Sequence, residues 1–135
     1  MATTSISRTF SGTPTDTKKW TFSAWVKRCT SGVQQLLLEG YGDSANYDII
    51  ELGSSDQLKY KSVSSSSEAA NQTTNRLFKD PAAWYHIVIA QDSTQASGGN
   101  RLKIYVNGTQ ITSLATDTQM SLNHASANMV FNTDD

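Results

Sequence analysis

The chain has 135 residues and a formal net charge of −1 at pH 7, with 37% hydrophobic and 17% charged residues. This length predicts one domain, spanning residues 1–135, with a hydrophobic core of its own. The near-neutral charge, without a block of like charge, argues against nucleic acid and anionic membranes as partners. No apolar run approaches the length of a transmembrane helix.

Short runs with strand character follow one another along the chain. The many β-branched residues and few helix formers favour an all-β protein. The expected strands are, in chain order, 4–10, 20–27, 34–39, 47–52, 58–62, 76–78, 84–90, 101–106 and 129–131. So many short strands at this spacing predict a β-sandwich.

Polar segments separate the expected strands. We expect loops at 40–46, 64–75, 91–100 and 115–127, and a turn at 53–56. The segment 64–75 is polar and of low complexity, so we expect it to be the most mobile part of the chain.

The alternation of apolar and polar residues assigns faces to several strands. The inward side chains of 20–27 are expected to be Trp20, Phe22, Ala24 and Val26, which leaves Trp25 on the polar, outward face. Segments 34–39, with the run Leu36-Leu37-Leu38, and 84–90 are apolar on both faces. We therefore expect these two strands to be covered on both sides.

Asn107-Gly108 marks a hairpin that starts from the strand at 101–106. Both residues tolerate a positive φ, which a two-residue type I′ turn requires. Such a turn pairs Val106 with Thr109 and Tyr105 with Gln110. The apolar side chains then share one face of the hairpin, so the turn and the hydrophobic pattern predict the same register.

The motifs AWYHIVIAQD and NRLKIYVNGTQI, together with KKWTFSAWVKR upstream, resemble the concanavalin A-like lectin/glucanase superfamily, in its laminin-G-like and pentraxin-like branch. The resemblance implies an antiparallel two-sheet jelly-roll sandwich. The segments DPAAWYHIV and DSTQASGGNRLKIYVNG resemble the corresponding segments in domains of marine bacteriophage virion proteins. Because one sandwich hosts many activities, the resemblance is specific for fold and much less so for function.

Lectins of this superfamily hold sugar with an aromatic side chain plus Asp and Asn, often ordered by calcium. The candidate ligand-binding residues are Trp25, Tyr41, Asp43, Asn46, Tyr47 and Tyr105. Calcium prefers several hard oxygen ligands, and the candidate metal ligands are Asp43, Asn46 and Asp48. The alternative for the segment 41–48 is a plain polar turn between two strands. The alternative for Trp25 is that a terminal strand or a loop covers it. We favour both alternatives.

The glucanases of the superfamily use carboxylates in a Glu-x-Asp-x-x-Glu run on one strand, and this chain has no such run. Asp48 and Glu51 are three residues apart, which places them on opposite faces of a strand. Glu39 stands alone, and we expect His86 to be half-buried under the sandwich. The chain is therefore expected not to be an enzyme.

The expected function is a non-catalytic recognition or structural module of a virion tail or capsid that touches host glycans. The alternative is a decoration or assembly protein without a ligand site. Residues 1–12 lack the apolar core of a signal peptide, so we expect synthesis in the cytoplasm and exit by lysis. Cys29 is expected to be an inert thiol in a loop, with no disulfide.

In the resembled family two further strands follow the Asn-Gly hairpin, and this sequence shows neither. We expect a fragment of a longer protein, or a domain that is completed by other copies or other virion proteins. An open sheet edge invites another strand. The expectation is a homo-oligomer, a dimer or trimer, with residues 128–135 near the contact.

Overall fold

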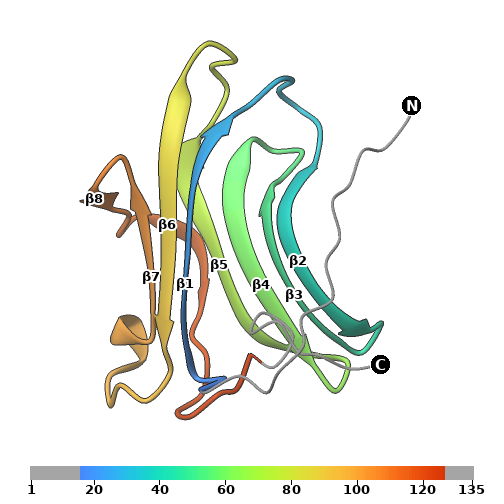
Figure 1. Ribbon diagram of the computed structural model, residues 1–135, viewed down its shortest axis with the longest axis vertical. Coiled ribbons are helices and arrows are strands. Elements are labelled where there is room, and N and C mark those ends of the chain that lie inside the picture. The colour runs from blue at the N-terminus through green and yellow to red at the C-terminus, as the bar shows by residue number, and fades with distance from the viewer. Residues whose placement is uncertain (1–15, 127–135) are drawn as a thin grey trace.

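Two antiparallel sheets face each other in the computed structural model, which describes residues 16–126 (Figure 1). The strands are β1 (Lys19–Lys27), β2 (Gln35–Asp43), β3 (Asn46–Leu52), β4 (Gln57–Ser64), β5 (Ser67–Leu77), β6 (Trp84–Asp92), β7 (Leu102–Val106), β8 (Thr109–Gln110) and β9 (Leu114–Thr118), with a 3₁₀ turn η1 (Gly98–Asn100). The four-stranded sheet has the order β1-β6-β7-β8, and the five-stranded sheet has the order β2-β3-β4-β5-β9. The predicted all-β two-sheet sandwich is confirmed, while the strands expected at 4–10 and 129–131 lie outside the described residues.

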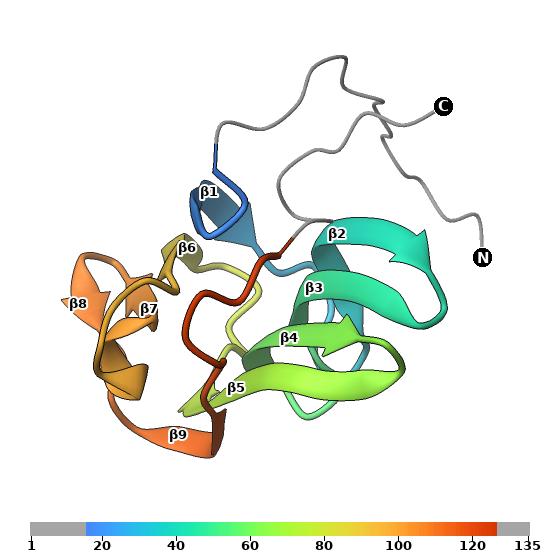
Figure 2. The same cartoon turned by 90° about the horizontal axis from the view of Figure 1, so that it is seen from below.

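The core fills the space between the two sheets, which Figure 2 shows as two layers. The strands β6 and β7 contribute Ile87, Ile89, Ile104 and Val106, each at most 1% exposed. The five-stranded sheet contributes Ile50, Leu52, Leu58 and Tyr60, all fully buried. Burying side chains of this size stabilises the fold by roughly 1.5–3 kcal/mol each.

The strand β1 alternates as predicted, but two expectations of coverage on both sides are wrong. On β6 only Tyr85, Ile87, Ile89 and Gln91 are buried, because no described segment packs on the other face. The strand β2 is an edge strand with a register shift between Leu36 and Leu38, and this leaves Leu36 48% exposed.

Three of the expected loops prove to contain strand. The strand β2 runs on to Asp43 and β3 begins at Asn46, so only a two-residue turn separates them. The segment expected to be mobile is most of β5, which lies between β4 and β9, and residues 114–118 form β9. The polar composition of β5 led to the prediction of an exposed loop. Its polar groups can be buried because they are hydrogen-bonded: Gln72 Nε2, for example, donates to Asp117 Oδ1 at 2.8 Å.

The Asn107-Gly108 hairpin has the predicted geometry. The two φ angles are +51° and +79°, and Val106 pairs with Thr109 and Tyr105 with Gln110. Asn107 has a second role, since its Oδ1 accepts a hydrogen bond from the backbone N–H of His86 at 2.8 Å. The turn therefore also anchors β6.

The buried Arg28 ties together three segments at one end of the sandwich. Its guanidinium donates to the backbone oxygens of Thr30, Val33 and Gly53, at 2.9, 2.7 and 3.1 Å, and pairs with Asp56 Oδ1 at 3.0 Å. Arg28 Nη1 also donates to the backbone oxygen of Phe78 at 3.4 Å, and since Arg28 is 1% exposed, these partners take the place of water around its charge. Removing one member of such a buried pair typically costs about 3–5 kcal/mol.

We predict that Gly108→Val lowers the free energy of unfolding by about 1–3 kcal/mol, because a β-branched residue resists a positive φ. Gly99→Val is the matched control: it also has open space around the added side chain, but no positive φ. Urea denaturation measures both variants. An unchanged midpoint for Gly108→Val, or an equal loss for Gly99→Val, would contradict the role assigned to the turn.

Candidate ligand-binding face

Four ring side chains gather on the outer face of the four-stranded sheet. We call Trp25, Trp84, His86 and Tyr105 the aromatic patch. Trp25 is opposite His86 in the β1–β6 register, and their rings stack with centroids 5.0 Å apart and planes 27° apart. Trp25 is 66% exposed and Trp84 57% exposed. Exposed indole rings of this size supply apolar area that a ligand can bury.

Hydrogen bonds and neighbouring charges hold the patch in place. The His86 Nε2 atom lies 3.0 Å from Ser23 Oγ, on the adjacent strand. Lys27 Nζ lies 6.0 Å from the centroid of the Trp84 ring. Because the rings stand on paired strands rather than on loops, their positions are set by the sheet register.

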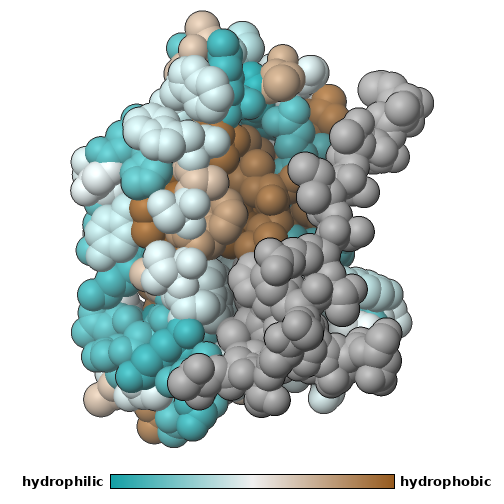
Figure 3. All heavy atoms as spheres, viewed as in Figure 1, coloured by the Kyte–Doolittle hydropathy of each residue, from teal (hydrophilic) through white to brown (hydrophobic). Residues whose placement is uncertain are grey.

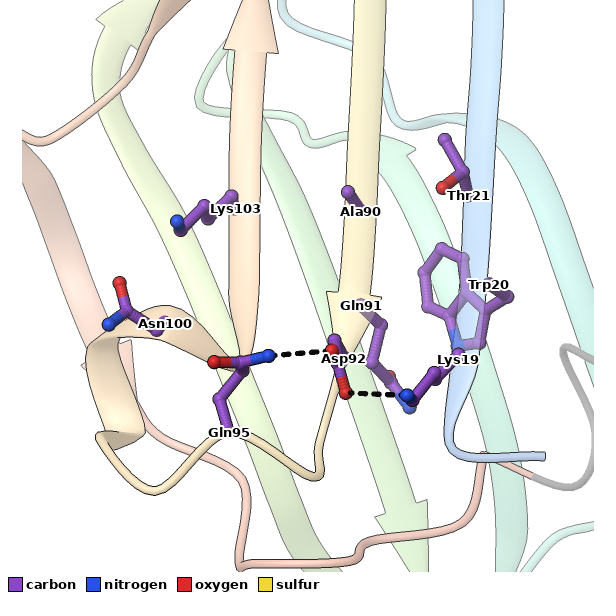
Figure 4. Close-up of a pocket in the computed structure, with 9 residues that line it drawn as sticks. All are labelled: Lys19, Trp20, Thr21, Ala90, Gln91, Asp92, Gln95, Asn100 and Lys103. Carbon is purple, nitrogen blue, oxygen red and sulfur yellow. Dashed lines mark hydrogen bonds and ion pairs between the residues drawn. The ribbon is translucent and has the colours of Figure 1, made fainter. Parts of the chain in front are cut away.

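A shallow hollow of about 630 Å³ lies on the same sheet, towards the other end of β6. The lining residues are Lys19, Trp20, Thr21, Ala90, Gln91, Asp92, Gln95, Asn100 and Lys103 (Figure 4). Thr21 pairs with Ala90, and Ala90 with Lys103, so the row across the hollow has small side chains at two of its three positions. The row Ser23-Val88-Tyr105 separates the hollow from the Trp25–His86 row.

Asp92 at the rim of the hollow is held by its own loop. Its carboxylate accepts hydrogen bonds from Thr94 Oγ1 at 2.5 Å and from Gln95 Nε2 at 2.7 Å. These two bonds are the main reason that the pKa of Asp92 lies below its usual range. Lys19 is a looser partner, with its Nζ 3.9 Å from Asp92 Oδ1.

The structure divides the candidate ligand-binding residues between two opposite faces. Trp25 and Tyr105 belong to the aromatic patch, and the favoured expectation that Trp25 is covered is wrong. Tyr41 and Tyr47 pair with each other on the outer face of the five-stranded sheet, where Lys61 Nζ lies 5.9 Å from the Tyr47 ring centroid. The signal that could have found Trp84 and His86 was their alternation with Tyr85 and Ile87.

The predicted calcium ligands are divided as well. Asp43 Oδ1 accepts hydrogen bonds from Ala45 N at 2.8 Å and Asn46 Nδ2 at 3.0 Å, which caps the β2–β3 turn. Asp48 is 2% exposed and accepts a hydrogen bond from the Tyr60 hydroxyl at 3.1 Å. Residues 16–126 contain no group of three or more His, Cys, Asp or Glu placed to hold a metal ion. Asp43 and Asn46 thus bind each other at the turn, while Asp48 is bound by Tyr60 in the interior.

A buried polar network at one end of the sandwich was not foreseen. The Tyr60 hydroxyl lies near Asp48 Oδ1, Gln91 Oε1 and Ser126 Oγ, and Ser126 Oγ donates to Gln91 Oε1 at 2.8 Å. His124 Nε2 lies 3.1 Å from Ser62 Oγ. Burial raises the pKa of Asp48 and lowers the pKa of His124. The members are too far apart in sequence for a local motif to reveal them.

The family model described as the concanavalin A-like lectin/glucanases superfamily, Laminin_G_3, matches residues 3–134. The chain belongs to this superfamily. Comparison with curated proteins and with solved structures gives no match. None of the helices in the described part of the chain is long and apolar enough to cross a membrane.

The superfamily contains both lectins and glycosidases, so side-chain geometry has to separate binding from hydrolysis. His86 is half-buried as expected, but it lies on the outer face against Trp25 and not under the sandwich. Its Ser23 partner stands on the same sheet face, on the adjacent strand β1. In the other Ser–His pair, Ser62 is only 2% exposed.

We predict that acidification destabilises the protein through His124. Its lowered pKa means that below about pH 6.5, the ordinary value, the unfolded chain takes up the proton more readily than the folded one. The free energy of unfolding should therefore fall between pH 7.5 and pH 5 by more in the native protein than in His124→Gln. The raised pKa of Asp48 acts in the opposite direction, but Asp48 is present in both proteins. Urea titrations at the two pH values make the comparison, and an equal fall in both proteins would contradict it.

Proposed function

We propose that this domain is a non-catalytic glycan-recognition module whose ligand lies across the outer face of the four-stranded sheet. One observation carries the proposal: two tryptophans, 66% and 57% exposed, stand on the same sheet face as a hollow lined mostly by polar residues. Sugar rings combine apolar C–H faces with many hydroxyl groups. An aromatic patch beside amide, hydroxyl and ammonium groups offers a surface for each.

The face requires little rearrangement on binding. Trp25 is already stacked on His86, and His86 is held by Ser23 and, through its backbone, by Asn107. Ordering loose side chains costs roughly 0.5–1.5 kcal/mol each, and this cost is reduced where the rings are fixed beforehand. The preorganised patch therefore favours binding even for a weakly interacting, hydrated ligand.

Carboxylate placement supports recognition over hydrolysis. Glycosidases use two carboxyl groups that flank the scissile bond. On the proposed face, Asp92 is the one outward carboxylate of the described strands, and its loop already satisfies it. On the other sheet, Glu51 is 3% exposed and engaged by Gln34 and by Lys59, whose Nζ lies at 2.8 Å.

The setting we propose is the surface of a virion tail or capsid, outside the cell after lysis. This part rests on the resemblance of the DPAAWYHIV and DSTQASGGNRLKIYVNG segments to virion domains. A decoration or assembly protein is the second candidate, because exposed Trp25 and Trp84 would equally suit contact with another copy or another virion protein. Light scattering separates the two, since assembly through this face predicts a dimer or trimer that Trp25→Ala dissociates.

We predict that Trp25→Ala and Trp84→Ala each weaken binding to a glycan by about tenfold or more, which corresponds to about 1.4 kcal/mol. A glycan array identifies the probe, and calorimetry then measures the dissociation constant. Tyr41→Ala, which removes an equally exposed ring from the opposite sheet, is the matched control and should leave affinity unchanged. Equal loss in Tyr41→Ala, or no array binding at all, would contradict the proposal.

A further inference from the structure

The two outer faces of the sandwich differ in charge. The outward side chains of β1, β6 and β7 include three lysines, Lys19, Lys27 and Lys103, and one carboxylate, Asp92. The outward side chains of the five-stranded sheet include Glu39, Glu51 and Glu68 against Lys59 and Lys61. Positive charge is therefore concentrated on the proposed ligand face, although the whole chain carries a net charge of −1.

The lysines at the hollow are only loosely compensated. Asp92 directs its short hydrogen bonds to Thr94 and Gln95, and Lys19 remains 3.9 Å away. No described residue forms a salt bridge with Lys103 within 4.0 Å. Lys19 and Lys103 thus border a hollow that holds one carboxylate, Asp92, so two positive charges and one negative charge leave it with a net charge of +1.

The shape of the hollow suits a compact anionic group. Lys19 and Lys103 come from β1 and β7, the two strands that flank β6. Lys103 is opposite Ala90 and Lys19 is opposite Asp92, so both β6 residues lie between the two lysines (Figure 4). Asn100 and Gln95 add amide groups on the side of the loop that precedes β7 (Figure 4). Because Ala90 carries only a methyl group, a carboxylate or sulfate can approach the sheet between the two ammonium groups.

Building on the proposed function, we infer that the hollow is an anion subsite and that the ligand is an acidic polysaccharide. The uronate carboxylate or sulfate ester of one sugar unit lies between Lys19 and Lys103, while another unit stacks on Trp25. Thr21 and Trp25 are four residues apart on β1, which is about 13 Å at 3.3 Å per residue. The ligand must therefore be an oligomer, because one pyranose ring cannot reach both positions.

Lysines and aromatic rings also bind single-stranded nucleic acid in other proteins. Such sites follow the charged backbone with a continuous basic groove, whereas the lysines of this face stand at its two ends, with Lys27 beside Trp84 and Lys19 and Lys103 at the hollow. The outward side chains of β1, β6 and β7 include no arginine. The arrangement favours a polymer that carries one anionic group per few units over one with a charge at every unit.

Calorimetry with four probes of matched length tests the inference: hyaluronan oligosaccharide, which has one carboxylate per disaccharide, a dextran oligosaccharide sulfated at about one unit in two, neutral dextran oligosaccharide and oligo(dT). At low salt we expect at least one acidic sugar to bind about tenfold more tightly than the neutral one, and the difference should shrink at high salt. Comparison of the first two probes tells whether carboxylate or sulfate is preferred. Tighter binding of oligo(dT) than of both acidic sugars would overturn the inference.

Two variants test the placement of the anion. Lys103→Met should weaken binding of the acidic sugar about five- to tenfold and leave the neutral sugar unchanged, whereas Lys61→Met, on the opposite sheet, should change neither. Ala90→Phe fills the hollow without removing a charge and should also abolish the acidic preference. Trp25-dependent binding of acidic and neutral sugars with equal affinity would overturn the anion subsite alone, whereas no sugar binding at all would overturn the proposed function as well.

Discussion

The pairing register of β6 with β1 and β7 is the constraint on which both the core and the proposed ligand face depend. In this register Ile87 and Ile89 enter the core, while Trp84, His86, Val88 and Ala90 face outward. A slip of one residue would exchange these two sets, exposing the isoleucines and burying a histidine and a tryptophan. The Asn107-Gly108 turn fixes one side of this pairing, and Asn107 additionally bonds the backbone of His86. The same hydrophobic energy that closes the sandwich therefore positions the ligand face.

The two ends of the sandwich are closed by polar groups that differ in chemistry. Arg28 and Asp56 form a charged, buried connection between the loop after β1 and the β3–β4 turn. The network of Asp48, Tyr60 and His124 joins the two sheets to the segment after β9 through hydroxyl and imidazole groups. Both clusters lie at the ends of the sandwich, and no described segment covers the outer face of the four-stranded sheet. This face is therefore accessible to a ligand.

The sequence predicted the structure correctly where a local pattern is compatible with only one conformation. The hairpin was predictable because a two-residue type I′ turn needs a positive φ at both positions, and Asn107 and Gly108 tolerate it. The faces of β1 were predictable because its apolar and polar residues alternate strictly. The prediction failed where burial depends on partners distant in sequence. Segment 64–75 looks like a loop because its buried Gln72 and Thr74 are polar, and their burial follows from the pairing of β5 with β4 and β9. The outward face of β6 looked buried because Trp84 and Val88 are apolar, a property that a ligand face shares with a core.

The candidate site was partly predictable for the same reason. Trp25 and Tyr105 were identified from their positions on the polar faces of their strands, and they do share one surface. Tyr41, Asp43, Asn46 and Tyr47 were grouped because they are adjacent in sequence, but the β2–β3 turn directs them to the opposite side of the molecule. The hollow between Lys19 and Lys103 joins residues 84 positions apart, which no local motif could bring together.

The three tryptophans allow the most direct test of the account, because their indole N–H groups give separate signals in a ¹H–¹⁵N NMR spectrum of the labelled protein. Titration with the tightest-binding oligosaccharide should shift the signals of Trp25 and Trp84, which are exposed, and an acidic oligosaccharide should in addition shift that of Trp20, which lines the hollow. Substitution of each tryptophan in turn assigns the signals. Shifts confined to the backbone around Tyr41 and Tyr47, with both exposed indoles unchanged, would contradict the placement of the ligand on the four-stranded sheet.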